Sequence, residues 1–133
     1  MNINKFTQKS MEAVNGLEKL AYEYGNQEVE QEHLLLSLLN IDDSLILKLI
    51  EKMEIDTDHF RRRVESGIQK RVKVRGGDLR IGQYLNQVLI NAEDEAKAMG
   101  DEYVSVEHLF LSMMAVQTEH KKLLINTELN LRL

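Results

Sequence analysis

The sequence contains no cysteine, no proline and no tryptophan, and aromatic residues make up only 5% of it. Without cysteine, the chain can form no disulfide framework, cysteine-ligated zinc site, iron–sulfur cluster or cysteine nucleophile. The absence of proline argues against many short strands joined by proline-marked turns, and it excludes a proline-rich linker. No hydrophobic run approaches the ~20 residues that a membrane-spanning helix needs, and the first residues lack the apolar stretch of a secretory signal. These absences favour a cytoplasmic, all-α domain that makes no contact with a membrane.

What the sequence does contain is enough apolar material for one core. It has 133 residues, of which 43% are hydrophobic and 29% are charged. A chain of this size buries roughly two-thirds of its unfolded surface and is too short for two independent cores. We therefore expect one domain over residues 1–133, with a core of aliphatic residues, alanine and methionine.

Apolar residues recur at spacings of three and four along most of the chain, which is typical of helices with one buried face. One such stripe, over residues 6–24, predicts a single helix that ends at a glycine. A nearly all-apolar helix beginning near residue 30 is expected to lie deep in the core. Further helices are expected from about residues 45, 57, 83 and 106, with a last short one after residue 117. Their predicted inward-facing residues include Leu45, Leu49 and Met99.

The chain nearly repeats itself, with the second copy beginning just past the middle of the sequence. The segment GNQEVEQEHLLLSLL over residues 25–39 aligns with GDEYVSVEHLFLSMM over residues 100–114. The identical pairs are Gly25 and Gly100, Val29 and Val104, Glu32 and Glu107, His33 and His108, Leu34 and Leu109, Leu36 and Leu111, and Ser37 and Ser112. Two copies are too few for a solenoid. We therefore expect one compact domain of two helical repeats related by a pseudo-two-fold axis.

The repeat also divides the chain. The first repeat covers about residues 4–69, a basic, glycine-containing loop covers residues 70–82, and the second repeat covers about residues 83–133, where the last helix is expected to be cut short. A groove where the two halves meet is the natural place for a ligand.

Charge is unevenly distributed along the chain. The net charge is −5, but residues 61–75 hold seven basic side chains and one acidic side chain, so the remainder carries −11. A broad positive face is needed to bind phosphate backbones, and no aromatic residues interleave with the basic ones for base stacking. Binding of nucleic acid through Arg61–Arg75 is therefore an alternative from another class of function, less favoured than a solvated helix face followed by a loop.

The familiar catalytic and cofactor motifs are absent from the sequence. It contains no GxxxxGK[ST], GxSxG, HExxH or GxGxxG, so we expect no catalysis, no metal and no cofactor in this chain. Glu32 and Glu107 fall in the first turn of their predicted helices, where a carboxylate meets the positive end of the helix dipole. We favour this stabilisation of the helix start as the role of both residues. Two such acids could also bind an arginine or lysine side chain of a peptide, or a modified arginine. The neighbouring His33 and His108 are interpreted as satisfied, partly buried residues.

The segments KFTQKS, EYGNQEVEQEHLLLSLL and DEYVSVEHLFL resemble the N-terminal domain of the Clp/Hsp100 chaperones, most of all the ClpB-type disaggregases. The resemblance runs from about residue 4 to residue 114 and includes both copies of the repeat. It implies the all-α double Clp-N fold, in a parent protein that is a hexameric AAA+ ATPase. ATP and Mg²⁺ would bind the parent's ATPase domains, and the parent would thread aggregated proteins through its pore together with the Hsp70 system.

For this chain, the resemblance implies a mobile, non-catalytic domain that binds unfolded or aggregated polypeptide and influences the ATPase ring. Family positions on the substrate-facing surface match Thr7, Asp101 and Glu107, and Glu32 is a possible secondary acidic site. The isolated domain is expected to be monomeric. The related alternative is a ClpC-type adaptor domain that binds phosphorylated arginine, but Gln31 and Val106 stand where that type usually has threonine.

Overall fold

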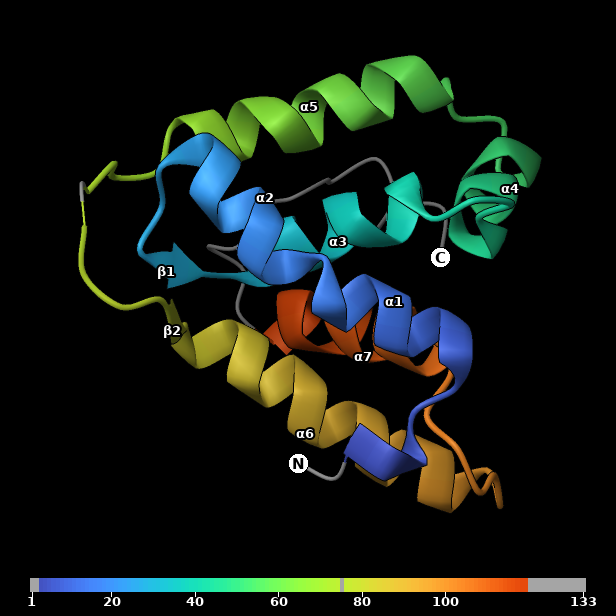
Figure 1. Ribbon diagram of the computed structural model, residues 1–133. Helices are drawn as coiled ribbons and strands as arrows, with labels where there is room; N and C mark the ends of the chain where they lie inside the picture. Colours follow the sequence, from blue (N-terminus) through green and yellow to red (C-terminus); the bar gives the residue numbers. More distant parts are fainter. Residues whose placement is uncertain (1–2, 75, 120–133) are drawn as a thin grey trace.

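The computed structural model describes residues 3–74 and 76–119, and most of that length is helical. In chain order the elements are η1 (Ile3–Lys5), α1 (Gln8–Asn15), α2 (Leu17–Tyr24), β1 (Glu28–Val29), α3 (Gln31–Asn40), α4 (Leu45–Lys52), α5 (Thr57–Gln69), β2 (Arg80–Ile81), α6 (Gln83–Ala98) and α7 (Val106–Glu119). Figure 1 shows α3 and α7 in the middle of the molecule, with α5 along one side, α6 along the other, and the strands and α4 at opposite ends. The predicted all-α fold is confirmed, with a single pair of two-residue strands in the described residues.

Helix α3 lies at the centre, as its apolar sequence predicts. Eight of its ten residues are buried, and it packs against α1, α2, α4, α5, α6 and α7. Its closest partner is α5, which contributes Phe60, Val64 and Ile68 from one face. Helix α7 packs against α6, as α3 packs against α1 and α2 in the first copy. One continuous core therefore joins the two halves.

The two copies exchange short strand contacts across the pseudo-two-fold axis. Val29 pairs with Ile81 in the parallel β1–β2 ladder, and Phe6 forms an isolated parallel bridge with Val104. In the alignment of the two copies, Phe6 is equivalent to Ile81 and Val29 is equivalent to Val104. Each copy therefore pairs the same strand position with the equivalent partner in the other copy. These pairings join the two halves, and they show that the repeat extends into the loop at residues 70–82.

A buried serine repeats the same contact in both copies. Ser37 Oγ donates a 2.6 Å hydrogen bond to the carbonyl of Ala13, and Ser112 Oγ donates a 2.6 Å bond to the carbonyl of Val88. Both the donors and the acceptors occupy equivalent positions in the alignment of the two copies. The sequence repeat is therefore also a repeat of tertiary hydrogen bonds.

The prediction of a single helix over residues 6–24 is wrong. Two helices, α1 and α2, meet at Gly16. Ser37 Oγ lies 2.9 Å from where a Cβ of Gly16 would be, and glycine has low helix propensity. In the second copy Asn91 stands at the equivalent position, and α6 runs without a break although the Val88 carbonyl accepts the same serine bond. The glycine is therefore the difference that ends α1.

Three residues predicted to face inward are exposed. The fractional exposures are 49% for Leu45, 39% for Leu49 and 57% for Met99. Helix α4 buries the other face, through Ile46 and Ile50, so its two leucines are left at the surface. Met99 follows the last residue of α6 and lies beyond the packed part of that helix.

Some predictions fall on parts of the chain that are not described. The short helix expected after residue 117, and with it the end of the second repeat, lies outside the described residues, as does Arg75. In the described residues, α7 runs as far as Glu119. No helix within residues 3–74 and 76–119 combines the length and the apolar character needed to cross a membrane.

Candidate functional site

In the first copy, His33 joins the start of α3 to the preceding loop. The backbone N–H of Glu30 donates a 2.9 Å hydrogen bond to its Nδ1, so the ring carries its proton on Nε2, which lies 3.0 Å from Asn26 Oδ1. Burial, together with a smaller effect of the positive charge of Arg71, lowers the pKa of His33 to about 4. The side chain is neutral at pH 7 and has a structural role.

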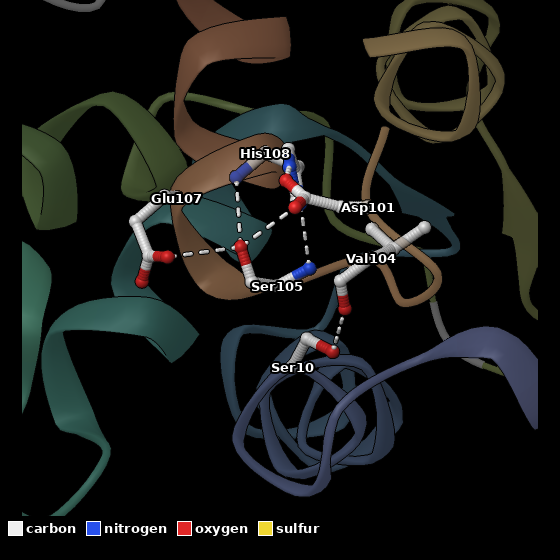
Figure 2. Close-up of polar contacts among 6 residues, drawn as sticks. All are labelled: Ser10, Asp101, Val104, Ser105, Glu107 and His108. Atoms are coloured by element: carbon white, nitrogen blue, oxygen red, sulfur yellow. Dashed lines mark hydrogen bonds and ion pairs between the residues drawn. The ribbon is translucent and has the colours of Figure 1, made fainter. Parts of the chain in front are cut away.

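The second copy builds the same arrangement with different partners, as Figure 2 shows. The backbone N–H of Ser105 donates a 2.9 Å bond to His108 Nδ1, and His108 Nε2 lies 2.9 Å from Asp101 Oδ2. Ser105 Oγ donates a 3.0 Å bond to Glu107 Oε2. Asp101 and Glu107, two of the predicted site residues, are thus connected through Ser105 and His108. Both carboxylates belong to exposed residues.

Thr7, the third predicted residue, is held against this segment. It is the N-cap of α1, and its hydroxyl accepts a 3.2 Å hydrogen bond from the backbone N–H of Ser10. The backbone N–H of Thr7 donates a 2.9 Å bond to the carbonyl of Val104, and Ser10 Oγ donates a 2.7 Å bond to the same oxygen. Thr7 and Glu107 line one cavity of about 320 Å³. Asp101 does not line it.

A second cavity of about 400 Å³ adjoins the first and shares Leu45, Ile46 and Glu107 with it. Leu49 and Leu111 also line this cavity. We call the two cavities together the Glu107 groove. Leu45 and Leu49 of α4, with Leu111 of α7 (44% exposed), give the groove an apolar surface.

The helical periodicity assigned Leu45 and Leu49 to the core and made no assignment for Leu111. A signal was present in the segment LILKLIEK over residues 45–52, because its apolar side chains cover more of the helix than the single face that one core contact can bury. Such an excess indicates that some of the apolar residues remain at the surface.

The structure treats the two acids of the repeat differently. Nε and Nη2 of Arg71 each lie 2.6 Å from Glu32 Oε2, and the Glu32 side chain is only 13% exposed. Within the described residues, Glu107 receives a hydrogen bond from Ser105 and pairs with no cation. The acid of the first copy is therefore already neutralised, and the acid of the second copy is available.

Several cations of the basic stretch are used inside the domain. Arg61 donates to the carbonyl of Leu39 at the end of α3 and to the side chain of Asn40. Lys73 Nζ donates a 2.8 Å bond to the carbonyl of Tyr24, the last residue of α2. A cation at a helix C-terminus is stabilising because it meets the negative end of the dipole. Among the described residues, no group of three metal-ligating side chains converges on one point.

These features define a class: a duplicated helical domain whose two copies share one core and whose surface, in the described residues, carries an open groove lined by leucines, lysines and Glu107. A family model described as the Clp repeat N-terminal domain matches residues 5–127. The chain belongs to this family of Clp N-terminal domains, and the predicted resemblance is confirmed.

Curated relatives agree with the family. The chain is 36% identical over 117 residues to the chaperone protein ClpB of Bacillus cereus and 37% identical over 124 residues to that of Porphyromonas gingivalis. These alignments cover 84% and 93% of this chain. The chain spans about 14% of the length of each relative.

Solved structures show the same fold at lower sequence identity. The N-terminal domain of Hsp104 from Candida albicans superposes with a TM-score of 0.76 at 21% identity, covering 89% of this chain and 81% of that one. The N-terminal domain of the ClpV1 ATPase from E. coli gives a TM-score of 0.77 at 21% identity, covering 92% and 72%. The fold is thus that of the N-terminal domains of Clp/Hsp100 ATPases.

Proposed function

We propose that this chain binds an extended, unfolded segment of polypeptide in the Glu107 groove. The observation that supports this most directly is the groove itself, where three half-exposed leucines lie beside a carboxylate that no cation in the described residues neutralises. Exposed apolar surface of this kind marks interaction sites. Hydrophobic contacts would supply most of the affinity, because they tolerate many sequences, and Thr7, Asp101 and Glu107 would add polar contacts at the rim.

The wider role in the proposal follows from the relatives. We propose that the chain is the non-catalytic N-terminal domain of a cytoplasmic, ClpB-type disaggregase, and that it regulates the parent as well as binding its substrates. In that parent, a hexameric AAA+ ring would use ATP and Mg²⁺ and would work with the Hsp70 system on aggregated proteins. The isolated domain is expected to be monomeric.

The ion pair between Glu32 and Arg71 argues against the phosphoarginine alternative. A receptor that uses the acids of both copies equally needs both carboxylates free, and Arg71 neutralises one of them. The contacts of Arg61, Arg71 and Lys73 with the body of the domain argue in the same way against a nucleic-acid interface. Binding of polypeptide in the Glu107 groove is therefore the function we favour.

A titration tests the proposal. Reduced, carboxymethylated lactalbumin, which stays unfolded, is added to the ¹⁵N-labelled chain, and we expect chemical-shift changes at Thr7, Leu45, Glu107 and Leu111. The double variant Leu45→Ser with Leu111→Ser should weaken binding about tenfold, because the lost burial of two half-exposed leucines costs on the order of 1 kcal/mol or more.

The matched control is Ile90→Ser on α6. Ile90 is 52% exposed and lines neither cavity of the Glu107 groove, so its variant should bind like the wild type. Absence of shifts in the groove, or equal loss of binding in the control, would contradict the proposal.

A further inference from the structure

A second surface lies at the end of the molecule opposite α4, where Figure 1 places the two short strands. It consists of two adjoining cavities of about 430 Å³ and about 250 Å³, which share Asn26, Gln27 and Val74. They are lined by the end of α2, by the segment before α3 and by residues from 70–74 and 76–80. We call the two cavities together the loop surface. It shares no lining residue with the Glu107 groove.

Large apolar side chains are exposed on the loop surface. Val72 is 80% exposed, Tyr22 is 66% exposed and Val74 is 42% exposed. Within the described residues, no large hydrophobic side chain is more exposed than Val72. Three such residues around adjoining cavities form an apolar patch, and patches of this kind with polar rims mark interaction sites.

The rim of the larger cavity is basic. Lys70, Arg71 and Arg80 line it, and Glu28 is the single acid among the described residues that do so. Arg80 Nη2 lies 3.4 Å from Glu28 Oε2 in a solvent-exposed pair. Such a pair is weak, so Arg80 can exchange it for the carboxylate of a ligand. Lys70 is exposed, and its ammonium has no partner in the described residues.

The backbone beneath the two valines is fixed. Asn26 Nδ2 donates a 3.2 Å hydrogen bond to the carbonyl of Val72, and the backbone N–H of Val74 donates a 2.9 Å bond to the carbonyl of Gly25. The valine side chains are thus presented to solvent from an ordered backbone. A ligand does not have to order this backbone when it binds, which lowers the entropic cost of binding.

The charge distribution of the chain restricts what the loop surface can bind. The net charge is −5, but residues 61–75 hold seven basic side chains and one acidic side chain, so the remainder carries −11. An acidic ligand is repelled by the remainder and attracted to the basic stretch. The loop surface therefore fits an acidic partner.

A polypeptide is favoured over a nucleic acid as this acidic partner. A phosphate backbone needs a broad positive face, whereas the cations here lie among the exposed valines and beside Glu28. A segment that carries both carboxylates and aliphatic side chains matches both features, because its acids meet the basic rim and its aliphatic groups cover the valines.

We propose that the loop surface binds an extended, acidic segment of a partner protein. Its carboxylates contact Lys70 and Arg80, and its aliphatic side chains lie on Val72 and Val74. The site is separate from the Glu107 groove, so the domain holds this partner and an unfolded segment at the same time. The inference goes beyond the proposed function and does not depend on it.

A synthetic peptide of alternating glutamate and valine, EVEVEV, is the probe for a test. It is labelled with fluorescein and titrated into the full chain by anisotropy, in parallel with QVQVQV and ESESES. We expect each of these two to bind about tenfold more weakly, because one lacks the charged contacts and the other lacks the apolar ones. Binding of EVEVEV should also weaken when the salt concentration rises from about 50 mM to about 200 mM.

Variants of the chain locate the peptide. Lys70→Gln with Arg80→Gln should weaken EVEVEV about tenfold and leave QVQVQV unchanged. Val72→Ser, at a mostly exposed position whose change does not disturb the fold, should weaken EVEVEV about threefold and leave ESESES unchanged. The matched control is Lys19→Gln with Lys97→Gln, which removes the same charge from exposed positions outside both cavities. It should bind like the wild type.

Several outcomes would overturn the inference. EVEVEV and QVQVQV could bind alike, or the control could lose as much binding as the Lys70 and Arg80 variant. Loss of EVEVEV binding in Leu45→Ser with Leu111→Ser, but not in the Lys70 and Arg80 variant, would place the peptide in the Glu107 groove.

Two other occupants of the loop surface are distinguished with the same variant. If a single-stranded oligothymidine binds the wild type more tightly than EVEVEV, and the Lys70 and Arg80 variant abolishes this binding, the surface belongs to a nucleic acid. If the chain self-associates in sedimentation velocity and the variant abolishes the association, the surface belongs to a second copy. Either result would show that the assignment to an acidic partner segment is wrong.

Discussion

The carboxylate of Glu30 caps helix α6 across the boundary between the two copies: its Oε1 accepts a 2.8 Å hydrogen bond from the backbone N–H of Leu85. Gly82, the N-cap residue of α6, has no side chain that could do this. At the equivalent position of the first copy, Thr7 caps its own helix by accepting from the N–H of Ser10. In the first copy, the start of α1 is therefore capped by its own N-cap residue. In the second copy, the start of α6 is capped by a residue of the first copy.

This relationship predicts that Gly82→Ala destabilises the fold. A Cβ at Gly82 would lie 2.6 Å from Glu30 Oε1, so the buried carboxylate would have to leave its place at the start of α6. We expect the free energy of unfolding in urea to fall by about 1–3 kcal/mol, as for other overpacked sites.

The control for this variant is Gly67→Ala in α5. Apart from the backbone of its own helix and its chain neighbours, no atom lies within 4 Å of where its Cβ would be, and alanine favours a helix interior over glycine by about 0.5–1 kcal/mol. Gly67→Ala should therefore stabilise the chain. Equal effects of the two substitutions would contradict the cross-copy cap.

The duplicated serine bond predicts similar losses in the two copies. Ser37→Ala and Ser112→Ala each leave a buried carbonyl without its 2.6 Å donor, which costs about 1–2 kcal/mol. Thermal or urea unfolding measures both. Ser66→Ala, at an exposed position of α5, should change stability little. A large loss in one copy alone would show that the repeat is not energetically equivalent.

The buried histidine of the first copy predicts a dependence of stability on pH. His33 has a pKa of about 4 in the folded chain and about 6.5 when unfolded. Between these values the unfolded chain binds a proton that the folded chain does not. The free energy of unfolding should therefore fall as pH falls from 6.5 to 4, with a slope that approaches about 1.4 kcal/mol per pH unit.

Glu30 acts in the opposite sense. Burial raises its pKa, although the bond from Leu85 and the charge of Arg71 oppose the shift. Its folded form holds a proton more tightly than its unfolded form, so this contribution is present at low pH and is lost as pH rises through the folded pKa. The effect of His33 must therefore be isolated by comparison with a variant.

Urea unfolding of the wild type and of His33→Gln at pH 7 and pH 5 makes that comparison. The stability difference between them should shrink by about 2 kcal/mol at the lower pH. His59→Gln, at an exposed position of α5, serves as the surface control. A difference for His33→Gln that does not change with pH would contradict the neutral, buried histidine.

The ion pair of the first copy predicts a cost when its cation is removed. Arg71→Gln leaves the mostly buried Glu32 carboxylate without its partner, and we expect a loss of about 1–2 kcal/mol in urea unfolding, since both groups are partly screened by water. Lys19→Gln breaks a solvent-exposed pair with Glu23 and should have no measurable effect. No loss for Arg71→Gln would mean that the pair is not formed in solution.

Much of the fold could be predicted from the sequence because local patterns carry it. Helical periodicity predicted α3, α5 and α6, and the internal repeat predicted the pseudo-two-fold architecture. The break at Gly16 could not be predicted in this way, because the apolar stripe continues through it. The equivalent serine contact leaves α6 unbroken at Asn91, so the low helix propensity of Gly16 is the difference between the two copies.

The candidate site was predicted only in part. The resemblance selected Thr7, Asp101 and Glu107, and their role in binding stays a prediction. Periodicity assigned Leu45 and Leu49 to the core, and the structure leaves them at the surface of the Glu107 groove. A hydrophobic pattern reports how much of a helix is apolar, but it does not report how much of that surface the neighbouring helices cover.

By itself, the sequence determined the helical class, the duplication and the chemical identity of the two acids, because composition, periodicity and repetition are properties of the chain alone. Only the tertiary structure decided that Glu32 and Glu107 differ. Arg71 is 39 residues away from Glu32 along the chain, and the loop brings its guanidinium to one acid and not to the other. Two glutamates that share the same Glu-His-Leu segment thus acquire different electrostatic environments, because a charge beside one of them comes from a distant part of the chain.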